Sequence, residues 1–335
     1  MTDIIGIDIG QYAVKFARIK KTGRSFVCSD LVYEVIPEDI RKGRNKEGMR
    51  NIVSNLLKFH KIVKGLPVIH VSSGDTVMRN VNIPDNVTPD QMEGAVELEL
   101  APNLPFNIEQ VYFDFEEQPS PDGTYLAVAA RRDIVDQKTE LFENRAKTLD
   151  APEVDVDVFA YERLVESLIE SNDVKANTIA IVDVGYAKSR IMVYQNGRYI
   201  FSRDAQVGGN QATEMFRDVY DIDMEAAESK KFNLTVDDEY NNLILKPYVA
   251  SFAEQINLAI DFYEASDSNA KRIERIYLTG GGSLLHGFVD KLSDAVSMPL
   301  ELLDLKSKLR GKAGNDAIQT SVNHSLAIAL AMEEK

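Results

Sequence analysis

The chain has 335 residues, a length that favours two domains of ordinary size over one small core. Hydrophobic residues make up 44% of it and the mean hydropathy is −0.22, so the composition is that of a soluble globular protein and excludes a disordered one. No apolar stretch approaches the roughly 20 residues of a membrane span, and no basic segment precedes the first apolar one. We therefore expect neither direct membrane insertion nor a secretory signal.

The formal net charge is −15, which counts against binding of nucleic acid or of anionic lipid. Solubility is the simplest explanation of this charge, and any membrane association is then expected to go through a protein partner. The single cysteine, Cys28, excludes an intramolecular disulfide and a cysteine-rich zinc site, and it fits a cytoplasmic protein. The four histidines are scattered, and none has a partner at metal-ligand spacing.

Short apolar segments and one amphipathic segment alternate at the start of the chain, in the order typical of an α/β fold. Strands are predicted over residues 4–9, 14–19, 26–35 and 67–71, where β-branched and other apolar residues dominate. A helix is predicted over residues 49–63, because apolar residues recur there at helical spacing.

A block of different character begins near residue 78. Its predicted elements are a strand over 77–83, a helix between Thr88 and Pro102, strands over 111–115 and 125–130, and a helix over 134–148. This order of elements indicates an inserted subdomain.

The second half of the chain opens in the same way as the first half. Residues 178–184 form an apolar strand that runs into Asp183-Val184-Gly185, as the first strand runs into Asp8-Ile9-Gly10, and a return strand follows each turn. The offset is 183 − 8 = 175 residues, about half of the chain, and this repeat predicts two duplicated α/β domains. The predicted division is a first domain over 1–77 and 151–177, an inserted subdomain over 78–150, a second domain over 178–320 with a helical subdomain at about 208–272, and a C-terminal helix over 321–335 that packs on the first domain.

Asp8 and Asp183 are candidate magnesium ligands, each at the end of a predicted buried strand. The backbone N–H groups of such a turn can cradle phosphate oxygens, and the carboxylate can hold Mg²⁺ through water. Lys15, on the first return strand, adds a positive charge. One Asp-x-Gly turn alone is an ordinary hairpin, but two that face each other across a cleft would clamp a β/γ-phosphate pair with one Mg²⁺.

Gly280, Gly281 and Gly282 follow a predicted strand over residues 276–278, and Ser283 leads into a predicted helix over 284–296. Three glycines at a strand-to-helix junction let the backbone approach a ligand closely, whereas the alternative is a flexible loop.

Glu228 and Lys231 lie three residues apart, hence on one face of a helix, and either form a surface ion pair or line the site. Gly208 and Gly209, before a helix over 211–220, are further candidates for the cleft. The sequence contains neither a Walker A lysine motif nor a G-x-S-x-G motif.

Together, the two Asp-x-Gly hairpins, the Ala-Glu-x-x-Lys segment and the triple glycine resemble the actin-like ATPase superfamily over nearly the whole chain. Within it, the IGIDIG start with Lys15 and the stretch VNIPDNVTPDQMEGAVELELAPNLPFNIEQVYFDFEEQP resemble the PilM family of type IV pilus assembly, which is itself similar to FtsA. This resemblance implies an actin-like ATPase fold with two duplicated α/β domains around a nucleotide cleft and an inserted FtsA-type subdomain.

The resemblance also implies ligands and roles. ATP and Mg²⁺ would bind in the cleft, with Asp8 and Asp183 organising the metal and Gly280, Gly281, Gly282 and Ser283 under the nucleotide. Glu228 and Lys231 would flank the ribose and adenine. The two phosphate loops would be Gly10, Gln11, Tyr12 and Ala13 with Lys15, and Gly185, Tyr186 and Ala187 with the adjacent Gly208 and Gly209. Asp157 would be a catalytic, water-orienting group.

The partner that the resemblance implies is the N-terminal cytoplasmic tail of a PilN-like membrane protein. This tail would lie in a groove between the first and the inserted subdomains and would hold the protein at the cytoplasmic face of the inner membrane. Other pilus assembly proteins and further copies of the chain remain open as partners.

The chain departs from the family in its phosphate loops, which are usually rich in Ser and Thr after the glycine. Here Gln11, Tyr12 and Ala13 follow Gly10, and Tyr186 and Ala187 follow Gly185, so few hydroxyls reach the phosphates and both tyrosines could crowd the γ-phosphate. We therefore expect nucleotide binding and gating rather than fast ATP hydrolysis.

Three alternative functions remain open. A relative of the type II secretion protein GspL, an FtsA-like filament former and a small-molecule kinase of the same fold would share these motifs. The chain ends AIALAMEEK, without the basic amphipathic tail of an FtsA-like protein, and the sequence shows no clear general base for a kinase.

Overall fold

The computed structural model describes residues 3–22, 25–43, 45–84, 86–116, 118–119, 123–170, 176–234, 236–266, 268, 270–296, 298–305, 309–311 and 318–332. The six-stranded sheet of the first half has the order β14-β3-β2-β1-β4-β8. Its strands are β1 (Ile4–Ile9), β2 (Ala13–Thr22), β3 (Ser25–Val35), β4 (Leu66–Val71), β8 (Glu153–Val156) and β14 (Leu309–Gly311). Helices α1 (Glu38–Gly43) and α2 (Lys46–Phe59) follow β3.

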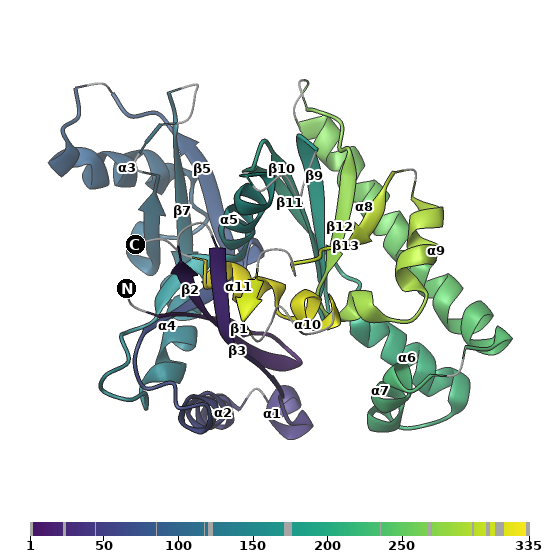
Figure 1. The fold of residues 1–335 in the computed structure, drawn as a ribbon. Helices are drawn as coiled ribbons and strands as arrows, with labels where there is room; N and C mark the ends of the chain where they lie inside the picture. The colour runs from purple at the N-terminus through teal and green to yellow at the C-terminus, as the bar shows by residue number, and fades with distance from the viewer. Residues whose placement is uncertain are drawn as a thin grey trace.

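The five-stranded sheet of the second half repeats this order as β11-β10-β9-β12-β13. Its strands are β9 (Thr178–Val184), β10 (Ser189–Gln195), β11 (Arg198–Ala205), β12 (Arg275–Thr279) and β13 (Leu300–Leu302). As β1 pairs antiparallel with β2 and parallel with β4, so β9 pairs antiparallel with β10 and parallel with β12. The predicted duplication of an α/β domain is confirmed by these two matching sheets (Figure 1).

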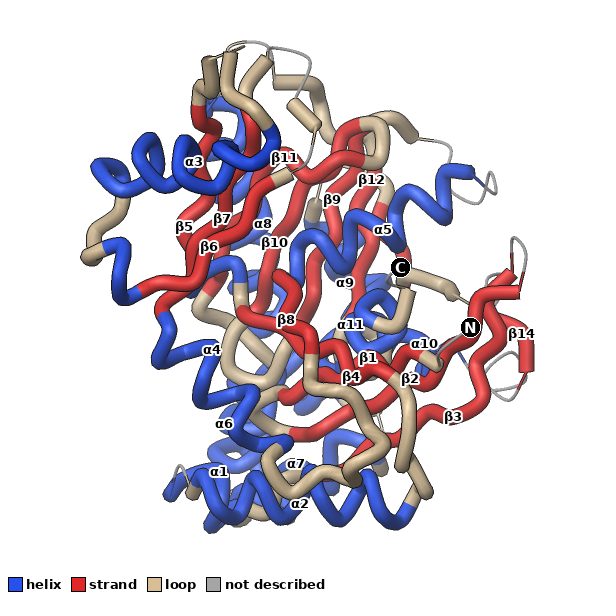
Figure 2. Tube along the Cα trace, turned by 90° about the vertical axis from the view of Figure 1, so that its left-hand side faces the viewer, coloured by secondary structure: helices blue, strands red, loops and turns tan. Residues whose placement is uncertain are grey.

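A three-stranded antiparallel sheet with the order β5-β7-β6 stands apart from the two larger sheets. It consists of β5 (Thr76–Val81), β6 (Val111–Phe115) and β7 (Tyr125–Arg131), with α3 (Met92–Leu100) before β6 and α4 (Arg132–Thr139) after β7. Figure 2 shows α3 lying across this sheet, at the opposite end of the molecule from α1 and α2. The prediction of one helix over residues 134–148 was wrong, because α4 ends at Thr139 and a 3-10 turn (Glu140–Phe142) follows.

The second half carries most of the remaining helices. They are α6 (Gly209–Tyr220), α7 (Met224–Phe232), a π-helical segment (Tyr240–Leu245), α8 (Lys246–Ser266) and α9 (Phe288–Ala295). The helix predicted over residues 284–296 begins later, at Phe288, because Gly287 before it has φ +72°, outside the right-handed helical region. Strands β8, β13 and β14 are only three or four residues long and were not predicted, since so short a segment shows no alternation.

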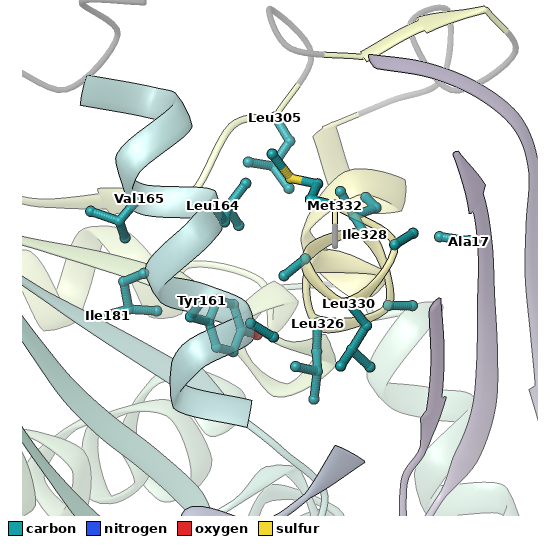
Figure 3. Packing of buried hydrophobic residues seen from close by; sticks show 14 of the residues in the cluster. Ala17, Tyr161, Leu164, Val165, Ile181, Leu305, Leu326, Ile328, Leu330 and Met332 are labelled. Atoms are coloured by element: carbon teal, nitrogen blue, oxygen red, sulfur yellow. The ribbon is translucent and has the colours of Figure 1, made fainter. Parts of the chain in front are cut away.

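Helices α5 (Asp157–Glu170) and α11 (Ser325–Leu330) pack between the two large sheets. The short α10 (Ile318–Asn323) precedes α11. One buried cluster holds Tyr161 and Leu164 of α5, Leu326 and Ile328 of α11, and residues from both sheets (Figure 3). Gly6 lets α11 lie directly on β1, because a Cβ atom on Gly6 would stand 1.9 Å from the carbonyl oxygen of Ala327. Within the described residues, no helix has the length and apolar character needed to cross a membrane.

Candidate functional site

A cavity of about 590 Å³ lies where the two β-hairpins of the duplicated sheets face each other. The glycine loop after β12 and the N-terminal end of α6 complete its wall. The predicted site residues that line it are Asp8, Gly10, Gln11, Tyr12, Ala13, Lys15, Asp157, Asp183, Gly185, Tyr186, Ala187, Gly209, Glu228, Lys231, Gly280, Gly281 and Gly282. Gly208 and Ser283 do not line it. Gly208 precedes α6, and Ser283 is fully buried and donates a hydrogen bond to the carbonyl oxygen of Gly280 at 2.7 Å.

Asp8 is the buried anion of the first hairpin. The register of β1 and β2 places Lys15 opposite it, and Lys15 Nζ lies 2.9 Å from Asp8 Oδ2. His70, at the end of β4, brings Nε2 to 3.4 Å from Asp8 Oδ1. Burial raises the pKa of Asp8, but the charge of Lys15 and the contact with His70 outweigh it and hold the pKa well below its usual value. Asp8 is therefore ionised at neutral pH.

Replacing Asp8 by Asn is expected to destabilise the fold by about 3 kcal/mol at neutral pH, because Lys15 loses its buried partner. A carboxyl group with a depressed pKa stabilises the folded state above its unfolded pKa of about 4, and this contribution fades as the pH falls below that value. The difference in unfolding free energy between wild type and Asp8→Asn should therefore shrink between pH 5 and pH 3, as measured by urea denaturation. The matched control is Asp30→Asn, which breaks a longer and more exposed pair with Arg18, at 3.5 Å, and is expected to cost about 0.5 kcal/mol. An equal cost for both variants would contradict the prediction.

Asp183 of the second hairpin has a tyrosine hydroxyl as its partner in place of a lysine. Tyr161 on α5 donates a hydrogen bond to Asp183 Oδ2 at 2.9 Å, and the same hydroxyl lies 2.9 Å from Ser325 Oγ at the start of α11. Burial raises the pKa of Asp183 and the charge of Asp8 adds to this, although Lys15 acts in the opposite direction. A cation between the two carboxylates would relieve their repulsion.

Arg190 occupies in the second hairpin the register position that Lys15 occupies in the first, since 190 − 15 = 175. It does not pair with Asp183. Its guanidinium group pairs with Asp204 on β11 and with Asp157, and it also donates to Ser72 Oγ at 2.5 Å. Arg190 thus ties the second sheet to two segments of the first half.

Asp157 begins α5 and is buried. One carboxylate oxygen pairs with Arg190, and the other accepts a hydrogen bond from the backbone N–H of Ser73 at 2.9 Å. Both oxygens therefore have structural partners, and the water-orienting role of Asp157 stays a prediction.

Tyr12 and Tyr186 meet across the cleft. Their rings stack with centroids 5.1 Å apart, and the guanidinium of Arg41 on α1 lies 4.7 Å from the ring centroid of Tyr12 and 5.5 Å from that of Tyr186. Such cation–π contacts typically contribute about 0.5–1 kcal/mol each at partly exposed sites. The two tyrosines of the predicted phosphate loops thus form an aromatic bridge between the halves.

The glycine loop needs its glycines for two reasons. Gly280 has φ +80°, and a Cβ atom there would stand 2.3 Å from Asp183 Oδ1. A Cβ atom on Gly282 would stand 2.5 Å from Val184 Cγ1, whereas one on Gly281 would approach only the side chain of Asn323. The loop therefore lies directly against the second Asp-x-Gly turn. Its glycines leave a space on the cleft side that larger side chains would fill.

Glu228 and Lys231 face the cleft as a partly buried pair at 2.9 Å. Lys231 also donates to Thr213 Oγ1 at 2.9 Å and to the carbonyl oxygen of Gly209 at 3.3 Å, and Thr213 donates to Glu228 at 2.5 Å. This network links α7 to the start of α6. The Glu228–Lys231 pair is therefore not a free surface ion pair, which was the alternative interpretation of this spacing.

The donor set fits a nucleotide better than a free metal ion. The described residues include no group of three His, Cys, Asp or Glu side chains that would hold a metal ion. The carboxylates of Asp8 and Asp183, several cations and a glycine cradle instead meet in one cavity, which suits a phosphate chain that brings its own Mg²⁺.

Several cavity residues were not predicted. His70 was set aside because no metal-ligand spacing surrounds it, yet β4 carries it to Asp8. Arg190 had a usable signal, its 175-residue offset from Lys15, whereas Tyr161 and Lys138 reach the cavity only through the packing of α5 and α4.

The two repeated sheets, with a cleft between their hairpins, form the actin-like ATPase fold that the sequence predicted. A family model described as type IV pilus assembly protein PilM matches residues 6–335. The chain belongs to this family.

Several solved structures are similar to this chain over nearly its whole length. A PilM–PilN type IV pilus biogenesis complex is 22% identical with a TM-score of 0.77, and the match covers 98% of this chain and 97% of that one. The ethanolamine utilization protein EutJ from Carboxydothermus hydrogenoformans is 15% identical with a TM-score of 0.55, covering 97% and 88%. An archaeal actin homologue in complex with ADP is 13% identical with a TM-score of 0.49, covering 99% and 98%.

Proposed function

We propose that the protein is an ATP-binding scaffold of type IV pilus assembly that binds the N-terminal tail of a PilN-like inner-membrane protein. The observation that carries this proposal is the meeting of two Asp-x-Gly hairpins and a glycine loop in one cavity, in a chain of the PilM family. The protein would act in the cytoplasm, at the inner membrane, through this partner.

In this proposal ATP lies in the cleft with its phosphates between the two hairpins. Backbone N–H groups of the loops after Gly10 and Gly185 would contact the phosphates, and Asp8 and Asp183 would hold Mg²⁺ through its water ligands. Glu228 and Lys231 would flank the nucleoside, and the glycine loop would lie against it. The metal would neutralise charge on the β- and γ-phosphates.

The tail would bind in a second cavity of about 360 Å³ between the three-stranded sheet and the first large sheet. Two sheet edges border it, since β6 and β8 are the last strands of their sheets. Its wall is largely apolar and includes Val71, Val128, Val135, Val156 and Phe159. Among the described residues, β6 pairs with β7 alone, so its outer edge can accept the backbone of an extended peptide.

A solved structure with the same fold supports this partner. The PilM–PilN complex has the same fold along the whole chain, and this chain belongs to the same family. In our proposal ATP draws the two halves together and this closure shapes the groove for the tail. The stacked Tyr12 and Tyr186 rings, one from each half, would move apart or tighten as the cleft opens or closes.

Val128→Glu is expected to weaken tail binding by about tenfold or more, because a carboxylate would replace an apolar group on the wall of the groove. The measurement is calorimetric titration with a synthetic peptide of the PilN-like tail from the same organism, with and without Mg·ATP. The control Val236→Glu puts the same charge on a half-exposed surface position outside both cavities and is expected to bind as the wild type does. Equal affinity of wild type and Val128→Glu would remove the tail from this groove.

A further inference from the structure

Five cationic side chains line the cleft, and four of them have carboxylate partners. Lys15 pairs with Asp8, Lys231 with Glu228, and both Lys188 and Arg190 pair with Asp204. The fifth is Lys138 on α4, which makes no ion pair and no hydrogen bond with any described residue. Its ammonium group is therefore the one in this cleft, within the described part of the chain, that makes no direct ion pair with a carboxylate, although the charges of Asp8 and Asp75 act on it.

Lys138 stands at the phosphate end of the cleft. It lines the cleft together with Asp8, Asp75, Lys188 and Arg190, and the charges of these four residues act on its ammonium group. Lys138 is partly buried, and this burial lowers the pKa of its amine because it has a free-energy cost for the charged ammonium form. An anion beside Lys138 would offset that cost.

Helix α4 also lines the second cavity. Val135 faces the groove and Lys138, one turn later on the same helix, faces the cleft. The wall between the cavities is thin elsewhere too, because Val71 and Val156 line the groove while the next residues, Ser72 and Asp157, line the cleft. Arg190 binds both Ser72 and Asp157. A shift of α4 against the groove therefore moves a cation within the cleft.

We infer that Lys138 is a ligand of the terminal phosphate of the bound nucleotide and that α4 couples this contact to occupancy of the groove. The inference rests on the proposed function of both cavities. Under this inference, Lys138 is the residue that distinguishes ATP from ADP. It lies on α4, which follows the last strand of the three-stranded sheet along the chain. Binding of the tail and of ATP then help each other by the same factor, because coupling between two sites is reciprocal.

The test compares wild type with Lys138→Met, which keeps the length of the side chain and removes its charge. We expect Lys138→Met to bind Mg·ATP about tenfold more weakly, the loss of one charge-assisted phosphate contact, and Mg·ADP within about twofold of wild type. Affinities are measured by calorimetry, first alone and then with saturating tail peptide. The peptide should tighten ATP binding in the wild type and not in Lys138→Met, while its own affinity for the nucleotide-free protein stays unchanged.

Two further variants separate charge from structure. Lys138→Arg keeps the charge and should retain most of the preference for ATP, whereas Lys147→Met removes a charge from an exposed position outside both cavities and should change nothing. An unchanged ATP-to-ADP affinity ratio in Lys138→Met, with wild-type binding intact, would overturn this inference alone. Failure of the wild-type protein to bind ATP would overturn it together with the proposed function.

Discussion

Gly281→Val is expected to lower the affinity for Mg·ATP by about a hundredfold while leaving the melting temperature nearly unchanged. Gly281 lines the cleft and is exposed to it, so a branched side chain there would occupy the space that we assign to the nucleotide. The backbone tolerates the change, because φ of Gly281 is not positive and a Cβ atom would meet only the carbonyl oxygen of the Asn323 side chain, at 2.9 Å. Calorimetry and thermal unfolding on the same preparation measure the two effects.

Gly43→Val is the control for this prediction. Gly43 lies at the end of α1, outside the cavity, and a Cβ atom there meets no atom within 4 Å. The control should bind ATP as the wild type does. Normal ATP binding by Gly281→Val would remove the glycine loop from the nucleotide site.

Gly6→Ala is expected to destabilise the fold by about 3 kcal/mol, the upper part of the usual range for overpacking. Its Cβ atom would stand 1.9 Å from the carbonyl oxygen of Ala327 and 2.6 Å from the backbone nitrogen of Ala331. Both atoms belong to the backbone of α11 and its end, so no side-chain rotation relieves the clash and the helix must move away from β1. Thermal and urea unfolding measure the loss of stability.

The matched control is Gly94→Ala in α3, where a Cβ atom meets nothing within 4 Å. Alanine favours a helix over glycine by roughly 1 kcal/mol, so this variant should be as stable as wild type or slightly more stable. If Gly6→Ala unfolds at the same temperature as Gly94→Ala, α11 does not depend on close contact with β1.

The parts of the fold that the sequence predicts well are those with strong local patterns. The apolar strands β1 and β9 each end in an Asp-x-Gly turn, and this repeated sequence pattern predicts the duplication. The short edge strands β8 and β14 pair with distant segments and have no pattern of their own, so only tertiary contacts define them.

The candidate site divides in a similar way. Residues inside a motif, such as Asp8, Gly185 and Gly281, were proposed from the sequence and line the cavity, because the turn that carries the motif also places it there. Residues that reach the cavity from other elements, such as His70, Tyr161 and Lys138, carry no local signal, since their positions depend on how helices and strands pack. The nucleotide roles of both groups stay predictions.

The stacked tyrosines have a consequence for how the two halves can be observed. Tyr12 and Tyr186 belong to different halves, and their rings lie 5.1 Å apart in a chain that contains no tryptophan. A single tryptophan placed at either position would be the only such fluorophore in the protein, and its emission would respond to the neighbouring ring and to Arg41. The molecule thus offers one natural place for an optical reporter of the cleft, at the point where the halves already touch.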